Sequence, residues 1–115
     1  MSLADSFNPN SKPKKREKSI ESYFTDRIKS IGGICYKFVS PGNSGVPDRV
    51  VLYKGCVAFI ELKRPGAKPR KLQRLVMQDI IGQGVPAFAI NSKEQVDNFI
   101  ARLLIDGSRW ERGKL

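Results

Sequence analysis

The sequence predicts an α/β fold in which the elements follow one another in the order α-β-β-β-α-β-α. Three observations carry this prediction. Apolar residues recur at helical spacing in three segments, four short apolar runs have strand composition, and turn-forming residues separate the segments. The 115 residues suffice for one domain with one core. We expect a disordered basic segment over residues 1–16, the folded domain over 17–107 and a C-terminal tail over 108–115.

The first helix is expected over residues 17–31, because Ile20, Phe24 and Ile28 fall on one helical face and Gly32-Gly33 supplies a stop. A first strand is expected over residues 33–40, "GICYKFVS". The sequence "PGNSG" then predicts a turn-rich loop.

Two further strands, "DRVVLY" and "CVAFIELK", are separated only by Lys54-Gly55, which predicts a tight hairpin. A second helix is expected from Pro69 to Gly82, with a stripe that includes Leu72, Leu75, Val76 and Ile80.

The sequence "VPAFAI" predicts a fourth strand, reached from the third by a right-handed parallel crossover. Ser92 is the expected N-cap of the last helix, with Gln95 three residues later. The inward face of that helix is expected to carry Val96, Phe99, Ile100, Leu103 and Leu104.

The hairpin places two carboxylates opposite one another. A two-residue loop at Lys54-Gly55 pairs the strands so that Asp48 faces Glu61, and opposed residues project from one face of a sheet. Lys63 lies two residues after Glu61 and therefore projects from the same face. Three charges are thus expected to converge beside the Gly-containing loop.

Two carboxylates this close require a proton on one of them or a cation between them. An oxygen ligand set without histidine or thiolate favours a hard cation, Mg²⁺ or Mn²⁺. The alternative is a local salt-bridge cluster in which Lys63 neutralises the pair. The flanking strands are apolar on both faces, which favours a buried sheet in which idle charges are costly, and hence the metal site.

The chain has a net charge of +10, which favours a polyanionic partner and above all nucleic acid. The alternative is a basic N-terminal segment that only promotes solubility. A second basic cluster follows the carboxylates and comprises Arg64, Lys68, Arg70, Lys71 and Arg74. A membrane partner is not expected, since no amphipathic helix is left over from the core.

The absence of histidine excludes Ser-His-Asp and Cys-His nucleophile systems and His-ligated zinc hydrolases. Cys35 and Cys56 lack the paired spacing of a zinc site. No segment has the apolar length of a membrane span or a secretory signal. The expected location is the cytoplasm, or the host cytoplasm if a phage encodes the protein.

The motifs "GVPD" with Asp48 and "ELK" with Glu61 and Lys63 resemble the PD-(D/E)XK nuclease pattern. The longer stretch "SPGNSGVPDRVVLYKG" resembles the VRR-NUC branch, which includes small stand-alone proteins of phages and bacteria. The resemblance covers about residues 18–104. It implies a mixed four-stranded sheet flanked by helices, in agreement with the element order above.

The resemblance also implies roles for individual residues. Asp48 and Glu61 would bind the metal together with the backbone carbonyl of Leu62, and Lys63 would orient the attacking water or stabilise charge on the phosphate. Whether one or two ions bind stays open.

A glutamate of the first helix usually completes such a site. Glu21 and Glu17 are the candidates, and Glu21 is preferred because it lies inside the packed part of the helix. Gln73 matches a glutamine that family members place near the site, and the alternative for Gln73 is an exposed helix position.

The expected activity is a Mg²⁺- or Mn²⁺-dependent deoxyribonuclease, an endonuclease that cuts branched DNA such as Holliday junctions. Alternatives are a general duplex or flap nicking nuclease and a catalytically idle DNA-binding module. The residues expected to contact DNA are Lys37, Asn43, Ser44, Arg49, Arg64, Lys68, Arg70, Lys71 and Arg74.

A homodimer is the expected working unit, because one small domain carries one active site and a four-way junction is cut on two strands. The candidate contact surfaces are the first helix, the loop over residues 41–44 and the tail with Trp110. For Trp110, packing against the core of its own chain is the alternative.

Overall fold

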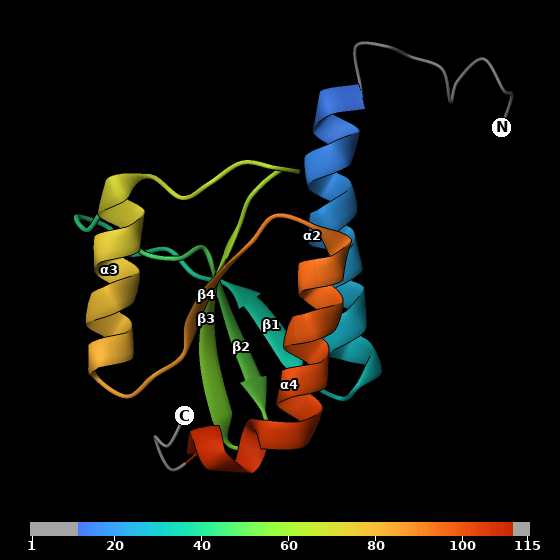
Figure 1. The fold of residues 1–115 in the computed structure, drawn as a ribbon, viewed down its shortest axis with the longest axis vertical. Helices are drawn as coiled ribbons and strands as arrows, with labels where there is room; N and C mark the ends of the chain where they lie inside the picture. The colour runs from blue at the N-terminus through green and yellow to red at the C-terminus, as the bar shows by residue number, and fades with distance from the viewer. Residues whose placement is uncertain (1–11, 112–115) are drawn as a thin grey trace, which may run out of the picture.

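The computed structural model describes the backbone of residues 12–111 and the side chains of residues 19–105. The elements in chain order are α2 (Lys12–Ser30), β1 (Ile34–Lys37), β2 (Arg49–Tyr53), β3 (Cys56–Leu62), α3 (Lys71–Gly82), β4 (Ala87–Ile90) and α4 (Lys93–Glu111). Figure 1 shows three layers, with the sheet between α3 on one side and α2 with α4 on the other. No helix of the described part is long and apolar enough to span a membrane.

The sheet has the strand order β1-β2-β3-β4 and is mixed, as expected. The first two pairings are antiparallel and the β3–β4 pairing is parallel. The hairpin has the predicted register, with Tyr53 opposite Cys56. Both loop residues have positive φ, 47° at Lys54 and 83° at Gly55, which matches the turn that a right-handed strand twist requires.

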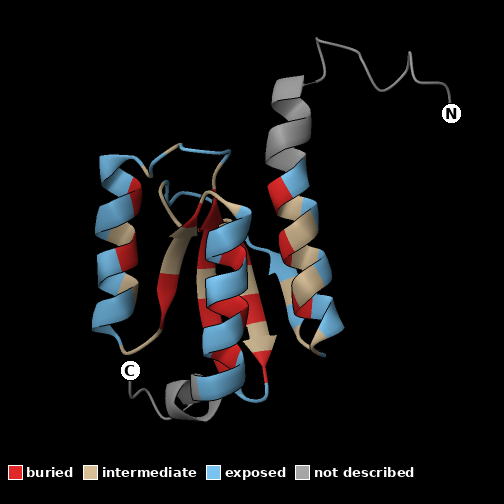
Figure 2. Ribbon diagram, turned by 45° about the vertical axis from the view of Figure 1, so that its right-hand side comes forward, coloured by how far each residue is buried: buried red, intermediate tan, exposed pale blue. Residues whose placement is uncertain are grey.

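The core lies between one sheet face and the helices α2 and α4. Ile20, Phe24 and Ile28 line the inner face of α2, as predicted, and the rings of Phe24 and Phe99 lie 5.8 Å apart. Figure 2 shows the buried residues concentrated on the strands and on the helix faces that meet them. The helical side of the core therefore comes mainly from α2 and α4.

Two predicted capping residues mark helix ends in the structure, but two of the helices are longer than predicted. Gly32, with φ of 85°, follows the end of α2, and the Ser92 hydroxyl accepts the Gln95 N–H at 3.1 Å at the start of α4. However, α2 begins at Lys12 rather than at residue 17, and α4 continues to Glu111. The rest of the expected terminal segments, and the side chain of Trp110, lie outside the described residues.

The predicted inward stripe of α3 is wrong in part. Leu72 and Leu75 are exposed, whereas Gln73 and Met77 are buried. Leu72 lies against the loop before β2, where a Cβ added at Gly45 would meet it at 2.9 Å. The helix is thus turned so that the glutamine faces the sheet.

Leu104 of α4 is likewise exposed, although we expected it to face inward. Its neighbour Leu103 is buried, together with Phe99 and Ile100. The buried stripe of α4 is therefore narrower than the apolar pattern predicts, because apolar composition alone does not fix where the helix surface leaves the core.

Candidate nuclease site at the end of the sheet

The β-hairpin brings Asp48 and Glu61 to the same end and the same face of the sheet. The register pairs Arg49 with Ile60, so the next position along the two strands sets Asp48 opposite Glu61, as predicted. Asp48 Oδ1 accepts the backbone N–H of Leu62 at 3.1 Å. This bond fixes the Asp48 carboxylate beside the strand that carries Glu61.

Lys63 and Gln73 converge on the second carboxylate. Lys63 Nζ lies 3.4 Å from Glu61 Oε2, and the side-chain amide of Gln73 donates to the same oxygen at 3.0 Å. Gln73 Oε1 in turn accepts the Arg70 backbone N–H at 2.8 Å, which directs its amide nitrogen toward Glu61. Gln73 is buried, so the alternative of an exposed helix position does not hold.

Burial acts on both acids, and the charge of a neighbouring carboxylate adds to its effect. Desolvation raises the pKa of Asp48 above its ordinary value, and the Leu62 N–H and Arg49 oppose this only in part. Desolvation also raises the pKa of Glu61, with a further rise from the charge of Asp48, against the lowering effect of Lys63. Both groups therefore bind a proton more readily than an exposed carboxylate, chiefly because burial removes them from water.

Glu21 lies next to this site but has another partner. Its Oε2 is 3.0 Å from a guanidinium nitrogen of Arg49, whose side chain is only 9% exposed, whereas that of Glu21 is 40% exposed. Glu21 is also among the charges that raise the pKa of Asp48. The helix glutamate is thus close enough to influence the acid pair while it neutralises a buried arginine.

Arg49 is the predicted DNA-contacting residue whose position differs most from expectation. Arg49 lies on the same face of β2 as the buried Val51 and Tyr53, because every second residue of a strand points to the same side. Its side chain therefore points into the core and not to the surface. Desolvation raises the pKa of the half-buried Cys35 thiol, and the neighbouring positive charge of Arg49 opposes this rise. The alternation of strand residues is a sequence signal that could have revealed this inward position.

The other residues expected to contact DNA are all exposed: Lys37, Asn43, Ser44, Arg64, Lys68, Arg70, Lys71 and Arg74. Those from Arg64 onward lie in the β3–α3 connection and the first turns of α3, directly after Lys63 and around Gln73. The surface next to the acid pair is therefore basic, which is the arrangement that a phosphate backbone requires.

The oxygen atoms at the site suit a hard divalent cation. The ligand atoms support this assignment. The pKa values of both carboxylates are raised, so a bound cation would stabilise their ionised forms. Carboxylate oxygens are the ligands that hard divalent cations prefer, and the chain has no histidine. Within the described residues, however, no cluster of three or more acidic, cysteine or histidine side chains is arranged to hold a metal ion. Asp48 and Glu61 form a pair, and Glu21 is directed to Arg49.

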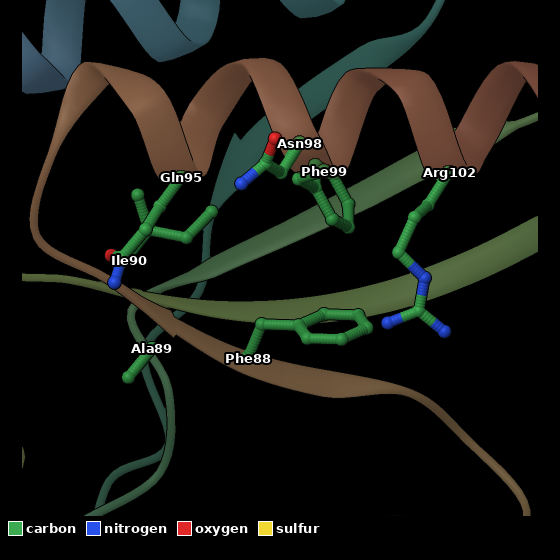
Figure 3. Close-up of a pocket in the computed structure, with 7 residues that line it drawn as sticks. All are labelled: Phe88, Ala89, Ile90, Gln95, Asn98, Phe99 and Arg102. Carbon is green, nitrogen blue, oxygen red and sulfur yellow. The ribbon is translucent and has the colours of Figure 1, made fainter.

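Cavities away from the acid pair are lined by described residues of other elements. A cavity of about 180 Å³ lies between β4 and α4, where Phe88 and Phe99 meet and Arg102 lies over the Phe88 ring (Figure 3). A second, of about 310 Å³, lies between α2 and β1. The first has no acidic residue in its lining. Neither lining includes Asp48 or Glu61.

The fold and the site together define the PD-(D/E)XK class: a mixed sheet whose hairpin carries an aspartate and a Glu-X-Lys motif at one end. A solved structure described as a VRR_NUC domain has a TM-score of 0.70 and 31% identity, and the match covers 75% of this chain and 95% of that one. A protein named "Putative nuclease p44", from Acyrthosiphon pisum secondary endosymbiont phage 1, is 42% identical over 80 residues, which are 69% of this chain and 86% of that protein. A scan against family models gave no match. The chain belongs to the VRR-NUC family.

The raised pKa values predict how stability depends on pH when no metal is present. Asp48 and Glu61 bind protons more tightly in the folded than in the unfolded chain, so the free energy of unfolding falls as pH rises above their ordinary values of 3.8 and 4.5. The variant Asp48→Asn/Glu61→Gln should lose this dependence. In chelator at pH 7 we expect it to be more stable than the wild type, with the difference shrinking toward pH 4.

Urea denaturation at several pH values, with both proteins in the same chelator, measures this difference. A wild type that is more stable than the double variant at pH 7 would contradict the electrostatic description of the pair.

Proposed function

We propose that the protein is a metal-dependent, structure-selective DNA endonuclease that hydrolyses phosphodiester bonds. The observation that carries the proposal is the convergence of Asp48, Glu61, Lys63 and Gln73 at one end of the sheet in a VRR-NUC chain. The net charge of +10 and the exposed basic residues around α3 support DNA as the substrate.

Mg²⁺ or Mn²⁺ is the proposed cofactor, held by the carboxylates of Asp48 and Glu61 with the backbone carbonyl of Leu62. A bound divalent cation supplies positive charge that acidifies water and offsets the charge developing on the phosphate. Glu21 is the proposed further ligand, since it lies near Asp48 and is partly exposed.

The surrounding residues orient the site before substrate arrives. The Leu62 N–H fixes Asp48, and the Gln73 amide fixes Glu61, so neither carboxylate must be reoriented when the phosphate binds. Lys63 places an ammonium group at the acid pair, where it can donate a hydrogen bond to the attacking water or to a phosphate oxygen. Exposed residues such as Lys68 and Lys71 contact neighbouring phosphates and hold the strand in position without reading its bases.

Branched DNA such as a Holliday junction is the proposed substrate, because the basic surface offers backbone contacts and, in the part of the chain that the structure describes, no element presents a base-reading helix. Flap or duplex nicking is the alternative within the enzyme class. A DNA-binding module without catalysis is the alternative outside it. Supercoiled plasmid and matched branched, flap and linear oligonucleotides distinguish the three.

The proposed chemistry predicts that Asp48→Asn, Glu61→Gln or Lys63→Ala lowers the cleavage rate by about a hundredfold or more, because each change removes charge that acts at the reacting phosphate. DNA binding should largely survive, since the phosphate contacts use other residues. Plasmid nicking with Mg²⁺ or Mn²⁺, beside electrophoretic mobility shifts, measures both properties.

Glu94→Gln is the matched control, because Glu94 is an exposed glutamate in the first turn of α4. It should leave cleavage unchanged. Cleavage that continues in excess chelator, or wild-type rates in any of the three variants, would remove the basis of the proposed mechanism.

The two glutamates of α2 predict different effects. Glu21→Gln should reduce cleavage more than Glu17→Gln, by about tenfold, because Glu21 lies at the acid pair and neutralises the buried Arg49. Thermal unfolding of both variants distinguishes a lost ligand from a loosened helix. Equal cleavage by the two variants, at equal stability, would count against Glu21 as the helix carboxylate.

A homodimer is the proposed working unit on junctions, since two sites related by a two-fold axis match the two strands to be cut. The proposed contact surfaces remain α2, the loop over residues 41–44 and the segment 108–115. The protein mass from light scattering, with the mass of bound DNA subtracted where junction DNA is present, should be twice the chain mass of 12.9 kDa. A mass of one chain under both conditions would instead favour simple nicking or flap cleavage.

A further inference from the structure

The sheet face that carries the acid pair also carries two aromatic side chains, Tyr36 on β1 and Phe38 directly after that strand. The Phe38 N–H donates to the Asp48 carbonyl at 2.8 Å, which continues the β1–β2 register by one residue. Phe38, Asp48 and Glu61 therefore form one row across three neighbouring strands, which are about 4.8 Å apart. Tyr36 belongs to the next row on the same face, opposite Val50.

These two rings lie on the part of the face that α3 leaves open. In the described residues α3 covers this face from the β4 side, and one helix about 10 Å wide spans only about two strands. Tyr36 is 59% exposed and Phe38 is 36% exposed. The face that carries the acid pair is thus open at β1, beside the hairpin strands that we expected to be buried on both faces.

Phe38 is nevertheless held in place. Its ring meets that of Phe59 edge-on, with centroids 5.4 Å apart and an interplanar angle of 78°. A ring fixed on one side and open on the other offers a prepared surface for stacking, because little freedom is lost when a planar group binds.

The location of the Phe38 and Tyr36 rings beside the acid pair indicates which kind of molecule would bind to them. Phe38 lies in the same row as Asp48 and Glu61, so a DNA strand whose phosphate binds at the acid pair and continues toward β1 would pass over its ring. Nucleic acid also matches the positive charge of the chain.

We propose that Phe38 and Tyr36 form a stacking surface for an unpaired base of DNA beside the scissile phosphate. A base in a regular duplex has both faces covered by its neighbours, so only a frayed, flipped or branch-point base can stack here. The surface thereby favours branched over continuous duplex DNA. This inference rests on the nuclease function proposed above.

Stacking can be measured apart from cleavage. The full chain in chelator is titrated into a short single strand that contains 2-aminopurine, whose fluorescence is quenched when it stacks. We expect quenching with the wild type and with Phe38→Trp, and a loss of affinity of about tenfold with Phe38→Ala or Tyr36→Ala. Phe38→Leu keeps an apolar contact with Phe59 but has no π-face, so it should also lose quenching.

Ile34→Ala is the matched control, since Ile34 is exposed on the same face of β1 but two rows away from Phe38. It should leave quenching unchanged. Thermal unfolding identifies variants that are poorly folded, and Phe38→Leu then provides the comparison in place of Phe38→Ala.

Cleavage gives the second measurement, with a splayed duplex and a continuous duplex of the same sequence. The preference for the splayed substrate should fall by about tenfold in Phe38→Ala, mainly through KM, and stay unchanged in Ile34→Ala. Undiminished quenching in Phe38→Leu and Phe38→Ala would overturn the proposal. So would equal losses in Ile34→Ala together with a change in solution mass, which would identify a protein contact. Quenching that depends on Phe38, in a protein that cuts no DNA, would support the stacking surface and refute the nuclease function.

Discussion

The repulsion between Asp48 and Glu61 is the interaction on which the rest of the site depends. Both acids are partly or fully removed from water, and the charge of Asp48 further raises the cost of charge on Glu61. Neighbouring groups stabilise the two carboxylates in part. The Leu62 N–H donates to Asp48, and Lys63 and Gln73 contact Glu61. The pKa values of Asp48 and Glu61 stay raised in spite of these partners, so a bound cation would stabilise their ionised forms further.

The hairpin between β2 and β3 holds Asp48 and Glu61 close together. Lys54 adopts a positive φ of 47° that non-glycine residues adopt infrequently, and this conformation keeps the loop at two residues. A register shift of one residue would move Asp48 to the other face and separate the acids. The conformation at Lys54 and the packed face with Val51 and Ala58 therefore fix the register together. Local turn geometry and core packing are thus both needed to build the acid pair.

The sequence predicts those features that short-range rules determine. Strand alternation and a two-residue loop suffice to place Asp48, Glu61 and Lys63 on one face, and the Ser92 cap follows from local hydrogen bonding. The rotation of α3 could not be predicted in this way, because Leu72 and Met77 are similarly apolar and only the neighbouring loop and sheet decide which of them is buried. The burial of Gln73 has the same origin, and only the family resemblance pointed to it.

Arg49 shows how one strand serves both faces of the sheet. Its neighbour Asp48 points to the open face, whereas Arg49 points to the core, where Glu21 compensates its charge. A buried arginine without a partner would be strongly destabilising, and here the Nε atom has no hydrogen-bond partner of its own. The ion pair therefore ties α2 to the first residue of β2, directly beside the acid pair. The Glu21 carboxylate of a helix that packs on one face therefore lies close to Asp48, which points to the other face, so charges from both faces of the sheet act on one carboxylate.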